Sequence, residues 1–523
     1  MKYNLYLSGF IAALLLVSGC KKQYEDFPVN VNRPINVPPG LVFTGILSDM
    51  NSDAPWSIRA NQFDVCNYNY YGDQRYDWTG AELNYQSLFN VVKMEEEAKR
   101  IGLVNDLKFY TAIGKFFRAF FFYRMTSLTG DLPMKDALKG SELIAPAYDS
   151  QKAIFLQILT WLEESNAELA TLISQADDSK IEGDIYFKNK SGWRKTINSF
   201  RLRVLISLSK KAADPELKIK ETFAAILADP SKYPIFGSSN DNLQYIYNNV
   251  NKYPSNPDNL GFDATRYNMA ATYLNNLVTI KDPRAFVTSE PATKQLSLGK
   301  TPADITAYVG ASSGEDLAEM SSKMSDVTKA EYSLRSRARY YADYVGEPGI
   351  IVGYAEMCFN ISEAINRGWV NGNAETWYKN GIKASLKFYG IPVDAPGIIV
   401  KDYPSGSSAS TGYYIPFDFE NVYYQQAAVK YSTIPATALQ QILLQKYLAF
   451  FQNSGWEPYF NWRRTGIPNF LTGTGTGNSG RIPKRFQYPS AERTTNGVNW
   501  AAAVKNQFGG TDDGINAEMW LIK

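Results

Sequence analysis

The stretch Asp106–Pro133 limits most strongly what this chain can fold into; it reads DLKFYTAIGKFFRAFFFYRMTSLTGDLP. Residues on one predicted helix face recur at steps of three, four and seven: Leu107, Tyr110, Gly114, Phe117, Phe121 and Leu128. Further rings cover much of the remaining surface: Phe116, Phe120, Phe122 and Tyr123. A helix that is apolar nearly all round is normally buried between other helices. Gly130 and Pro133 are expected to end it. The stretch therefore predicts helical layers on both sides of one central helix.

Amphipathic segments recur along the chain, and several come in pairs joined by short loops. The predicted pairs are Trp78–Ile101 with the Asp106 helix, Ser150–Ile173 with Trp193–Ala213, and Ile351–Arg367 with Ala374–Tyr389. Single helices are predicted at Leu41–Met50, Glu216–Ala228, Ala270–Ile280 and Ala436–Phe451. The segments between them are rich in Asn, Gly, Pro and Tyr, and Gly473–Gly480 is predicted to be a flexible loop. Paired helices of this length predict a mainly all-α, degenerate helical-repeat scaffold with long irregular loop insertions. We expect a single domain over 40–523.

The N-terminus has the features of an export signal. Lys2 precedes a short apolar run, Leu5–Val17, which is too short to span a bilayer. Small residues then lead to Cys20, a pattern that resembles a bacterial lipobox. By that resemblance, 1–19 is a cleaved signal peptide and Cys20 becomes the lipidated first residue of the mature protein. The polar, proline-rich segment 20–39 would be its tether. An ordinary secretory signal with an incidental cysteine is the alternative.

The composition excludes several classes of function. The chain has no histidine, which rules out Ser-His-Asp and Cys-His nucleophiles and every His-ligated metal site. Lys plus Arg is 54 and Asp plus Glu is 52, so no overall field attracts nucleic acid. Besides Cys20 there are Cys66 and Cys358, without metal-type spacing. Whether these two pair is left open, although Cys358 lies in an apolar helical pattern typical of a buried thiol. No cofactor or metal is predicted.

The candidate binding segment is Asn67–Trp78, NYNYYGDQRYDW. Its candidate ligand-binding residues are Tyr68, Tyr70, Tyr71, Arg75, Tyr76 and Trp78. Aromatic rings offer flat apolar faces with polar edges, and the neighbouring amides and charges offer hydrogen bonds. This mixture suits the ring faces and hydroxyl rims of sugars, and it would also suit an extended peptide. A second cluster is Tyr340, Tyr341 and Tyr344. The alternative is that these side chains pack the loops onto the helices.

Short motifs that occur in the same order as in a known family extend over nearly the whole chain. They are the lipobox, Phe27–Pro34, Lys115–Tyr123 with Gly130–Pro133, Ala355-Glu356 with Glu363-Ala364, Gln445–Tyr447, Trp462–Gly466, Arg481–Pro483 and Tyr488-Pro489. Each motif alone is weak. Together they resemble the SusD/RagB-like nutrient-binding outer-membrane lipoproteins, in a branch that diverges from the starch-binding members.

The resemblance implies a tetratricopeptide-like helical superhelix, lipid-anchored on the outer face of the outer membrane. It implies a lid over a TonB-dependent, SusC-like β-barrel transporter, and capture of an oligosaccharide or another oligomeric nutrient without catalysis. An oligopeptide is the alternative ligand. A surface glycoside hydrolase with two carboxylates and a purely structural adaptor are the alternative classes. No carboxylate pair stands out, and Asp512 and Asp513 match no established calcium loop.

Overall fold

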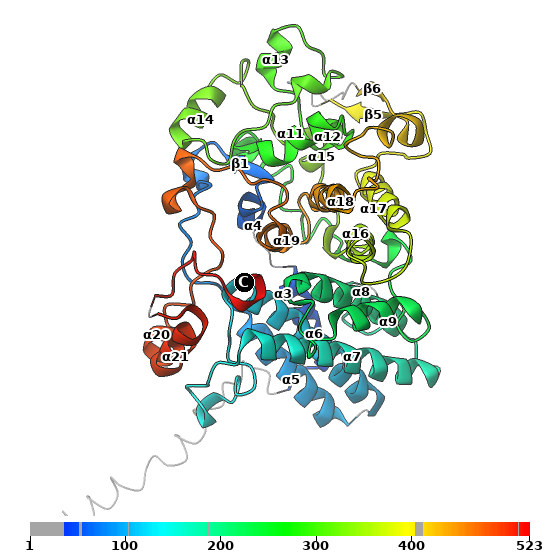
Figure 1. The fold of residues 1–523 in the computed structure, drawn as a ribbon, viewed down its shortest axis with the longest axis vertical. Helices are drawn as coiled ribbons and strands as arrows, with labels where there is room; N and C mark the ends of the chain where they lie inside the picture. Colours follow the sequence, from blue (N-terminus) through cyan, green and yellow to red (C-terminus); the bar gives the residue numbers. More distant parts are fainter. Residues whose placement is uncertain (1–35, 52–54, 103, 187, 403–411, 511) are drawn as a thin grey trace, which may run out of the picture.

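The computed structural model describes residues 36–51, 55–102, 104–186, 188–402, 412–510 and 512–523. The described part is mainly helical, with short two-stranded sheets (Figure 1). None of its helices is long and apolar enough to cross a membrane. The predicted signal peptide, Cys20 and most of the tether lie outside the described residues.

One half of the molecule is a stack of long helices around the predicted central helix (Figure 1). It consists of α3 (Pro39–Met50), α5 (Tyr85–Ile101), α6 (Val104–Thr129), α7 (Gln151–Ser174), α8 (Lys190–Ser207) and α9 (Ile219–Ala228). Helix α6 packs against α5 on one side and α7 on the other. Its Phe116 ring lies 5.8 Å from Trp193 of α8, and its Phe122 ring lies 5.8 Å from Trp161 of α7. The prediction of helical layers on both sides of α6 is confirmed.

The other half contains a second helical layer, formed by α16 (Tyr354–Asn366), α17 (Ala374–Phe388), α18 (Pro435–Ala449) and α19 (Glu457–Thr465). Helix α16 packs against α17 and α18, and it also contacts α8 of the first stack. Arg203 of α8 donates from Nε to Oε1 of Glu356 on α16 at 2.7 Å. The helical pairs and the degenerate helical-repeat architecture predicted from the sequence are therefore confirmed, and buried ion pairs help to join the two halves.

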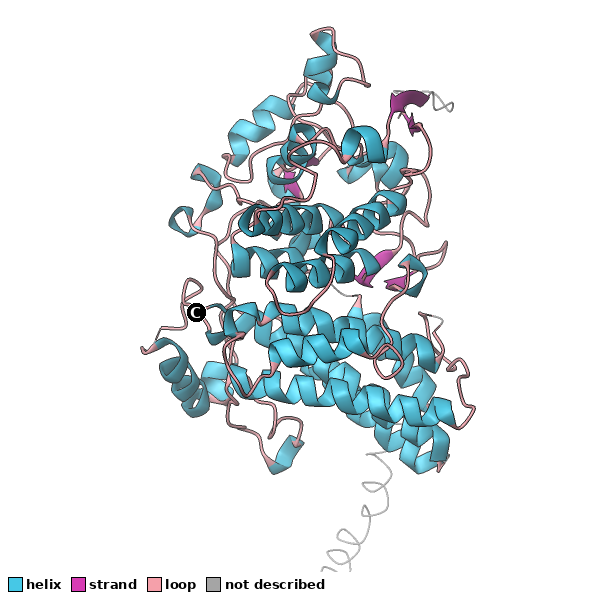
Figure 2. Ribbon diagram, turned by 45° about the vertical axis from the view of Figure 1, so that its right-hand side comes forward, coloured by secondary structure: helices cyan, strands magenta, loops and turns pink. Residues whose placement is uncertain are grey.

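The long insertions carry short elements that cover the second layer (Figure 2). The short helices are α4 (Pro55–Ala60), α10 (Leu260–Asp263), α11 (Ala271–Thr279), α12 (Arg284–Thr288), α13 (Thr293–Ser297), α14 (Leu317–Met324) and α15 (Arg337–Tyr340). The antiparallel pairs are β1 (Asp64–Cys66) with β3 (Tyr267–Met269), β2 (Leu243–Tyr245) with β4 (Gly349–Val352), and β5 (Gly397–Lys401) with β6 (Gly412–Pro416). Pairs such as β1–β3 hold distant insertions together.

Several predicted boundaries differ from the structure, and two of them differ because the chain pairs there with a distant segment. Helix α5 begins at Tyr85 rather than near Trp78, because the preceding residues pair with the C-terminal segment. Ala81 donates its backbone N–H to Gln487 at 2.9 Å, and Gln487 donates to Thr79 at 3.1 Å. Helix α16 likewise begins at Tyr354, because Gly349–Val352 is strand β4. In both places, hydrogen bonds to a distant segment of the same chain replace the helix that the local pattern predicted.

The C-terminal segment is more structured than the sequence suggested. It contains α20 (Glu492–Thr495) and α21 (Gly497–Phe508), which the sequence analysis did not identify. Gln507 of α21 accepts from the backbone N–H of Asp131 at 2.9 Å, which docks α21 at the end of α6. Thr476, in the Gly473–Gly480 loop that was predicted to be flexible, accepts a 2.7 Å hydrogen bond from the Tyr76 backbone N–H. The flexibility of this loop stays a prediction.

The structure settles the cysteine question for Cys66 and Cys358, which are both buried and unpaired with each other. It also accounts for one of the two acidic residues considered for calcium. Asp513 is fully buried and forms an ion pair with Arg485 at 2.5 Å. Among the described residues, no group of three His, Cys, Asp or Glu side chains is placed to hold a metal ion.

Candidate functional site

The segment after β1 places three tyrosines together at the surface. Strand β1 ends at Cys66, and a single 3-10 turn follows at Asn69–Tyr71. Tyr70 is 82% exposed and Tyr68 is 42% exposed. The Tyr70 and Tyr71 rings lie 5.3 Å apart, and the Tyr68 and Tyr71 rings 6.1 Å apart. We call Tyr68, Tyr70 and Tyr71 the tyrosine cluster.

Hydrogen bonds from Asn67 and Arg59 hold the backbone that carries the tyrosine cluster. Asn67 is buried and donates to the Thr265 carbonyl at 3.0 Å and to Asn268 Oδ1 at 2.8 Å. Arg59 donates to the Tyr71 carbonyl at 2.8 Å. Gly72 follows with φ +101, and a Cβ there would lie 2.7 Å from the Arg59 guanidinium. Because residues with a side chain rarely adopt this backbone conformation, glycine at position 72 fixes the end of the turn.

A hollow of about 490 Å³ lies beside Tyr68. Its polar and aromatic lining includes Asn67, Tyr68, Arg266, Glu290, Tyr332 and Arg337. Ser321 and Met324 of α14 (Leu317–Met324) and the following Ser325 also belong to the lining. Ligand sites are usually concave and measure about 300–1,000 Å³, so the hollow has the size of a small-oligomer site. We call it the tyrosine hollow.

The charged groups of the tyrosine hollow are arranged in two different ways. Arg337 donates from Nη2 to Oε2 of Glu290 at 2.7 Å and from Nε to Oε1 at 3.0 Å, so this pair is bidentate. The Arg266 guanidinium lies over the Tyr68 ring, 4.5 Å from its centroid. Tyr332 donates to Glu315 at 2.8 Å. The site thus combines an aromatic face with hydrogen-bonding groups held in place, which is suited to binding a polar ligand.

Tyr76 and Trp78, which the sequence analysis placed in the site, belong instead to the core. Trp78 is 5% exposed and stacks on Phe486, with ring centroids 4.3 Å apart and planes at 14°. Tyr76 is buried and donates its hydroxyl to the Ala60 carbonyl at 3.0 Å. Neither ring offers a surface to a ligand, so the alternative that these aromatics pack the loop onto the helices applies to both. Burial of the Tyr76 hydroxyl also raises its pKa.

The second predicted cluster, Tyr340, Tyr341 and Tyr344, also contains both buried and surface residues. Tyr340 and Tyr341 are buried, and Tyr340 packs 6.3 Å from the rings of Tyr253 and Phe451. Tyr344 is near the surface, where it donates to Asp258 at 2.8 Å, and it does not line the tyrosine hollow. The prediction that Tyr340 and Tyr341 bind a ligand was therefore wrong, because both side chains belong to the core.

Arg75 also lies outside the hollow lining. It is exposed and forms a 2.5 Å ion pair with Asp77, two residues along the chain. Of the residues proposed from the sequence, Tyr68 is the one found in the lining of the tyrosine hollow, with Tyr70 and Tyr71 beside it in the cluster.

Four residues of the lining were not predicted from the sequence: Arg266, Glu290, Tyr332 and Arg337. They are single residues in the loosely patterned insertion, and the β1–β3 pairing brings part of that insertion to the tyrosine cluster. Asp64 pairs with Met269 and Cys66 with Tyr267 across about two hundred residues of chain. The one available signal was the short strand-like run at 267–269, which carries no strong pattern of its own.

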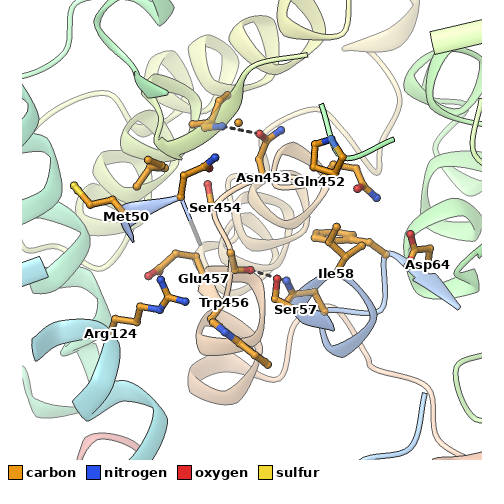
Figure 3. Close-up of a pocket in the computed structure, with 18 of the residues that line it drawn as sticks. Met50, Ser57, Ile58, Asp64, Arg124, Gln452, Asn453, Ser454, Trp456 and Glu457 are labelled. Atoms are coloured by element: carbon orange, nitrogen blue, oxygen red, sulfur yellow. Dashed lines mark hydrogen bonds between the residues drawn. The ribbon is translucent and has the colours of Figure 1, made fainter. Parts of the chain in front are cut away.

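A second cavity lies between the two helical halves (Figure 3). It measures about 180 Å³, and its lining includes Met50, Asp64, Arg124, Gln452, Asn453 and Glu457. Burial raises the pKa of Asp64, which lies 3.6 Å from Arg335. The cavity is smaller than usual ligand pockets of about 300 Å³ or more. The tyrosine hollow is therefore the stronger candidate for an oligomeric ligand.

Comparisons with known proteins give consistent matches. A model of a SusD-like family, described as "Starch-binding associating with outer membrane", matches residues 43–489. A solved SusD homolog from Bacteroides fragilis is 28% identical, with a TM-score of 0.80 over 93% of this chain and 100% of that one. A second homolog from the same species is 31% identical, with a TM-score of 0.76 over 93% and 100%. A comparison with curated proteins gave no match.

A more distant structural match is a chitin-binding SusD homolog from Flavobacterium johnsoniae. It is 19% identical, with a TM-score of 0.68 over 93% of this chain and 98% of that one. At this identity the match supports the shared fold.

Proposed function

This chain belongs to the SusD-like family, described as starch-binding and associated with the outer membrane, and from that membership we propose that it captures an oligosaccharide at the cell surface. It then delivers the ligand to a TonB-dependent, SusC-like β-barrel transporter. The partner and the delivery step follow from the family resemblance, whereas the binding step has support in this chain's own geometry.

The observation that carries the proposal is the exposed tyrosine cluster beside the tyrosine hollow. Tyr70 is largely exposed and Tyr68 is partly exposed beside Arg266, while Asn67 and Gly72 hold the turn that carries both rings. Aromatic faces stack on the apolar faces of sugar rings, while neighbouring hydrogen-bonding groups meet the hydroxyl rim. An oligomeric ligand can extend from the hollow over Tyr70.

The carboxylates of the tyrosine hollow support binding rather than hydrolysis. Glycoside hydrolysis normally needs two carboxyl groups on either side of the bond that breaks. Among the described residues of the lining, Glu290 is the one carboxylate, and Arg337 holds both of its oxygens. This arrangement leaves no general acid and base pair facing a bound sugar, so we propose that the protein is not an enzyme.

Replacing Tyr68 with Ala is expected to weaken oligosaccharide binding about tenfold while leaving the melting temperature nearly unchanged. A lost aromatic contact costs about 0.5–1.5 kcal/mol beyond burial, and about 1.4 kcal/mol corresponds to tenfold in affinity. Isothermal titration calorimetry against malto-, cello-, xylo- and chito-oligosaccharides and a peptide mixture measures the effect. Tyr344→Ala is the matched control, because Tyr344 lies near the surface outside the hollow.

Equal loss of affinity in Tyr68→Ala and Tyr344→Ala would contradict this placement of the site. Binding of peptides, with no oligosaccharide bound, would assign the oligopeptide function instead.

We also propose that Cys20 carries the lipid anchor and that 1–19 is removed. The basis is the short apolar run and the small residues before Cys20. Cys20→Ser is expected to move the protein from the membrane fraction to the soluble fraction and to abolish incorporation of labelled palmitate. Continued membrane association of the variant, together with no label in the wild type, would contradict the proposal.

A further inference from the structure

Arg266 differs from the other cation of the tyrosine hollow. Arg337 is neutralised by its bidentate pair with Glu290. For Arg266, by contrast, no ion pair with a carboxylate of the described residues is found, and its Nε is buried without a hydrogen-bond partner. Its one described side-chain interaction is with the Tyr68 ring, 4.5 Å from the guanidinium carbon. The hollow therefore contains a guanidinium group that forms no ion pair with a carboxylate of the described residues.

The lining of the tyrosine hollow as a whole is also positively charged. Arg266 and Arg337 contribute two positive charges and Glu290 one negative charge, which leaves one net positive charge. Complementary charge favours binding, so a site with one excess positive charge favours an anionic ligand over a neutral one. The planar guanidinium favours carboxylate and sulfate groups, which can accept two parallel hydrogen bonds.

Tyr68 sets a second requirement for a ligand that pairs with Arg266. Its ring is 42% exposed, and it contacts the Arg266 guanidinium directly. A ligand that uses both groups needs a flat apolar face with an anionic substituent a few ångströms away. A sugar ring bearing a carboxylate or a sulfate ester has both features, whereas a neutral sugar lacks the anionic substituent.

We propose that the tyrosine hollow selects acidic oligosaccharides, whose anionic substituent pairs with Arg266 while the ring packs on Tyr68. This inference rests on the proposed oligosaccharide-binding function and narrows its ligand class. The shared chemistry is a sugar-borne anion, which a uronic acid or a sulfate ester can supply.

The test is calorimetry of the purified full chain with four probes of matched length, at low and at moderate salt. The probes are oligogalacturonides, sulfated chondroitin oligosaccharides, their desulfated forms, and neutral malto-oligosaccharides. We expect the acidic probes to bind at least tenfold more tightly than the neutral one at low salt, with the difference shrinking as salt rises. Loss of the preference on desulfation assigns the sulfate ester, and its retention assigns the carboxylate.

Arg266→Gln should weaken acidic-probe binding about tenfold or more and change neutral-probe binding less than about twofold. Lys252→Gln is the matched control: it also removes one positive charge beside a tyrosine, 4.2 Å from the Tyr344 centroid, but outside the hollow. It should leave the preference intact, which separates a local contact from overall charge. Should Arg266→Gln fold poorly, Arg266→Lys keeps the charge without the planar fork, and we expect a partial loss.

The outcomes separate this inference from the function on which it rests. If neutral and acidic oligosaccharides bind equally and Arg266→Gln affects both alike, the selectivity is overturned while oligosaccharide capture stands. If neither class binds at millimolar concentration, the proposed function itself fails. If Lys252→Gln reduces the acidic preference as much as Arg266→Gln does, the preference comes from general charge and the assignment of Arg266 is overturned.

Discussion

Replacing Glu363 with Gln is expected to lower the free energy of unfolding by about 3–5 kcal/mol at pH 7, because it leaves a buried cation uncompensated. Glu363 lies on α16 and is fully buried. Its Oε2 accepts from Nη2 of Arg464 on α19 at 2.9 Å, and its Oε1 accepts from Nε of Arg367 at 2.8 Å. The carboxylate therefore links α16, the end of its last turn and α19, and a neutral amide can satisfy only part of this arrangement.

The same group predicts a pH dependence with a definite sign. The Arg464 and Arg367 guanidinium groups outweigh the effect of burial and lower the Glu363 pKa from 4.5 to about 2. A carboxyl group with a lowered folded-state pKa stabilises the protein above its unfolded pKa, and this contribution is lost as pH falls toward the folded value. The difference in stability between wild type and Glu363→Gln should therefore be constant above about pH 5.5 and shrink on the order of 1 kcal/mol by about pH 3.5.

Urea unfolding of both proteins between pH 7 and pH 3.5 measures this difference. Glu420→Gln is the control, because Glu420 is half-exposed and pairs at the surface with Lys379 and Lys383 at 2.7 Å. Exposed pairs usually contribute about 0–1 kcal/mol, so the control should change little. A loss below 1 kcal/mol for Glu363→Gln, or a gap that widens on acidification, would show that the buried pair does not hold α16 to α19.

Local periodicity explains why most of the long helices could be predicted. In α6 and α7 the apolar positions recur within one or two turns, so each segment carries its own signal. The very apolar surface of α6 also predicted neighbours on both sides, since no other arrangement removes its rings from water. The strands could not be predicted, because β1 and β3 are three residues long and pair across the chain. Such elements owe their existence to tertiary contacts rather than to local preference.

The binding segment shows where composition fails as a guide to the site. In NYNYYGDQRYDW, Tyr68 and Tyr70 lie at the surface before Gly72, whereas Tyr76 and Trp78 lie in the core after it. Tyr70 and Tyr76 differ in exposure because the chain turns at Gly72 and then hydrogen-bonds to the C-terminal segment at Thr476. Neither contact has a signature near the tyrosines. Arg266 was missed for a related reason, since its role depends on the β1–β3 pairing that places it over Tyr68.

Trp78→Ala is expected to lower the free energy of unfolding by about 3–5 kcal/mol, the usual range for truncating a buried Trp or Phe. Trp78 stacks on Phe486 and lies 5.0 Å from Tyr459 of α19 and 5.6 Å from Trp456, ring centroid to ring centroid. These partners come from the C-terminal half, so the indole joins the segment after the tyrosine cluster to α19. Its removal leaves a cavity between parts of the chain that are far apart in sequence.

The comparison that decides between a core role and a binding role is Trp78→Ala against Tyr70→Ala. Tyr70 lies eight positions earlier and is 82% exposed, so its truncation should change stability by no more than about 0.5 kcal/mol. We expect the midpoint of urea unfolding to fall for Trp78→Ala with little change in the slope, and to stay in place for Tyr70→Ala.

Calorimetry at a temperature where both variants are folded should show weaker oligosaccharide binding for Tyr70→Ala, since that ring is free to contact a ligand. Normal stability with reduced affinity in Trp78→Ala would return Trp78 to the binding site and contradict the core assignment. The two substitutions thus test whether Gly72 marks the boundary between the part of this segment that can bind a ligand and the part that supports it.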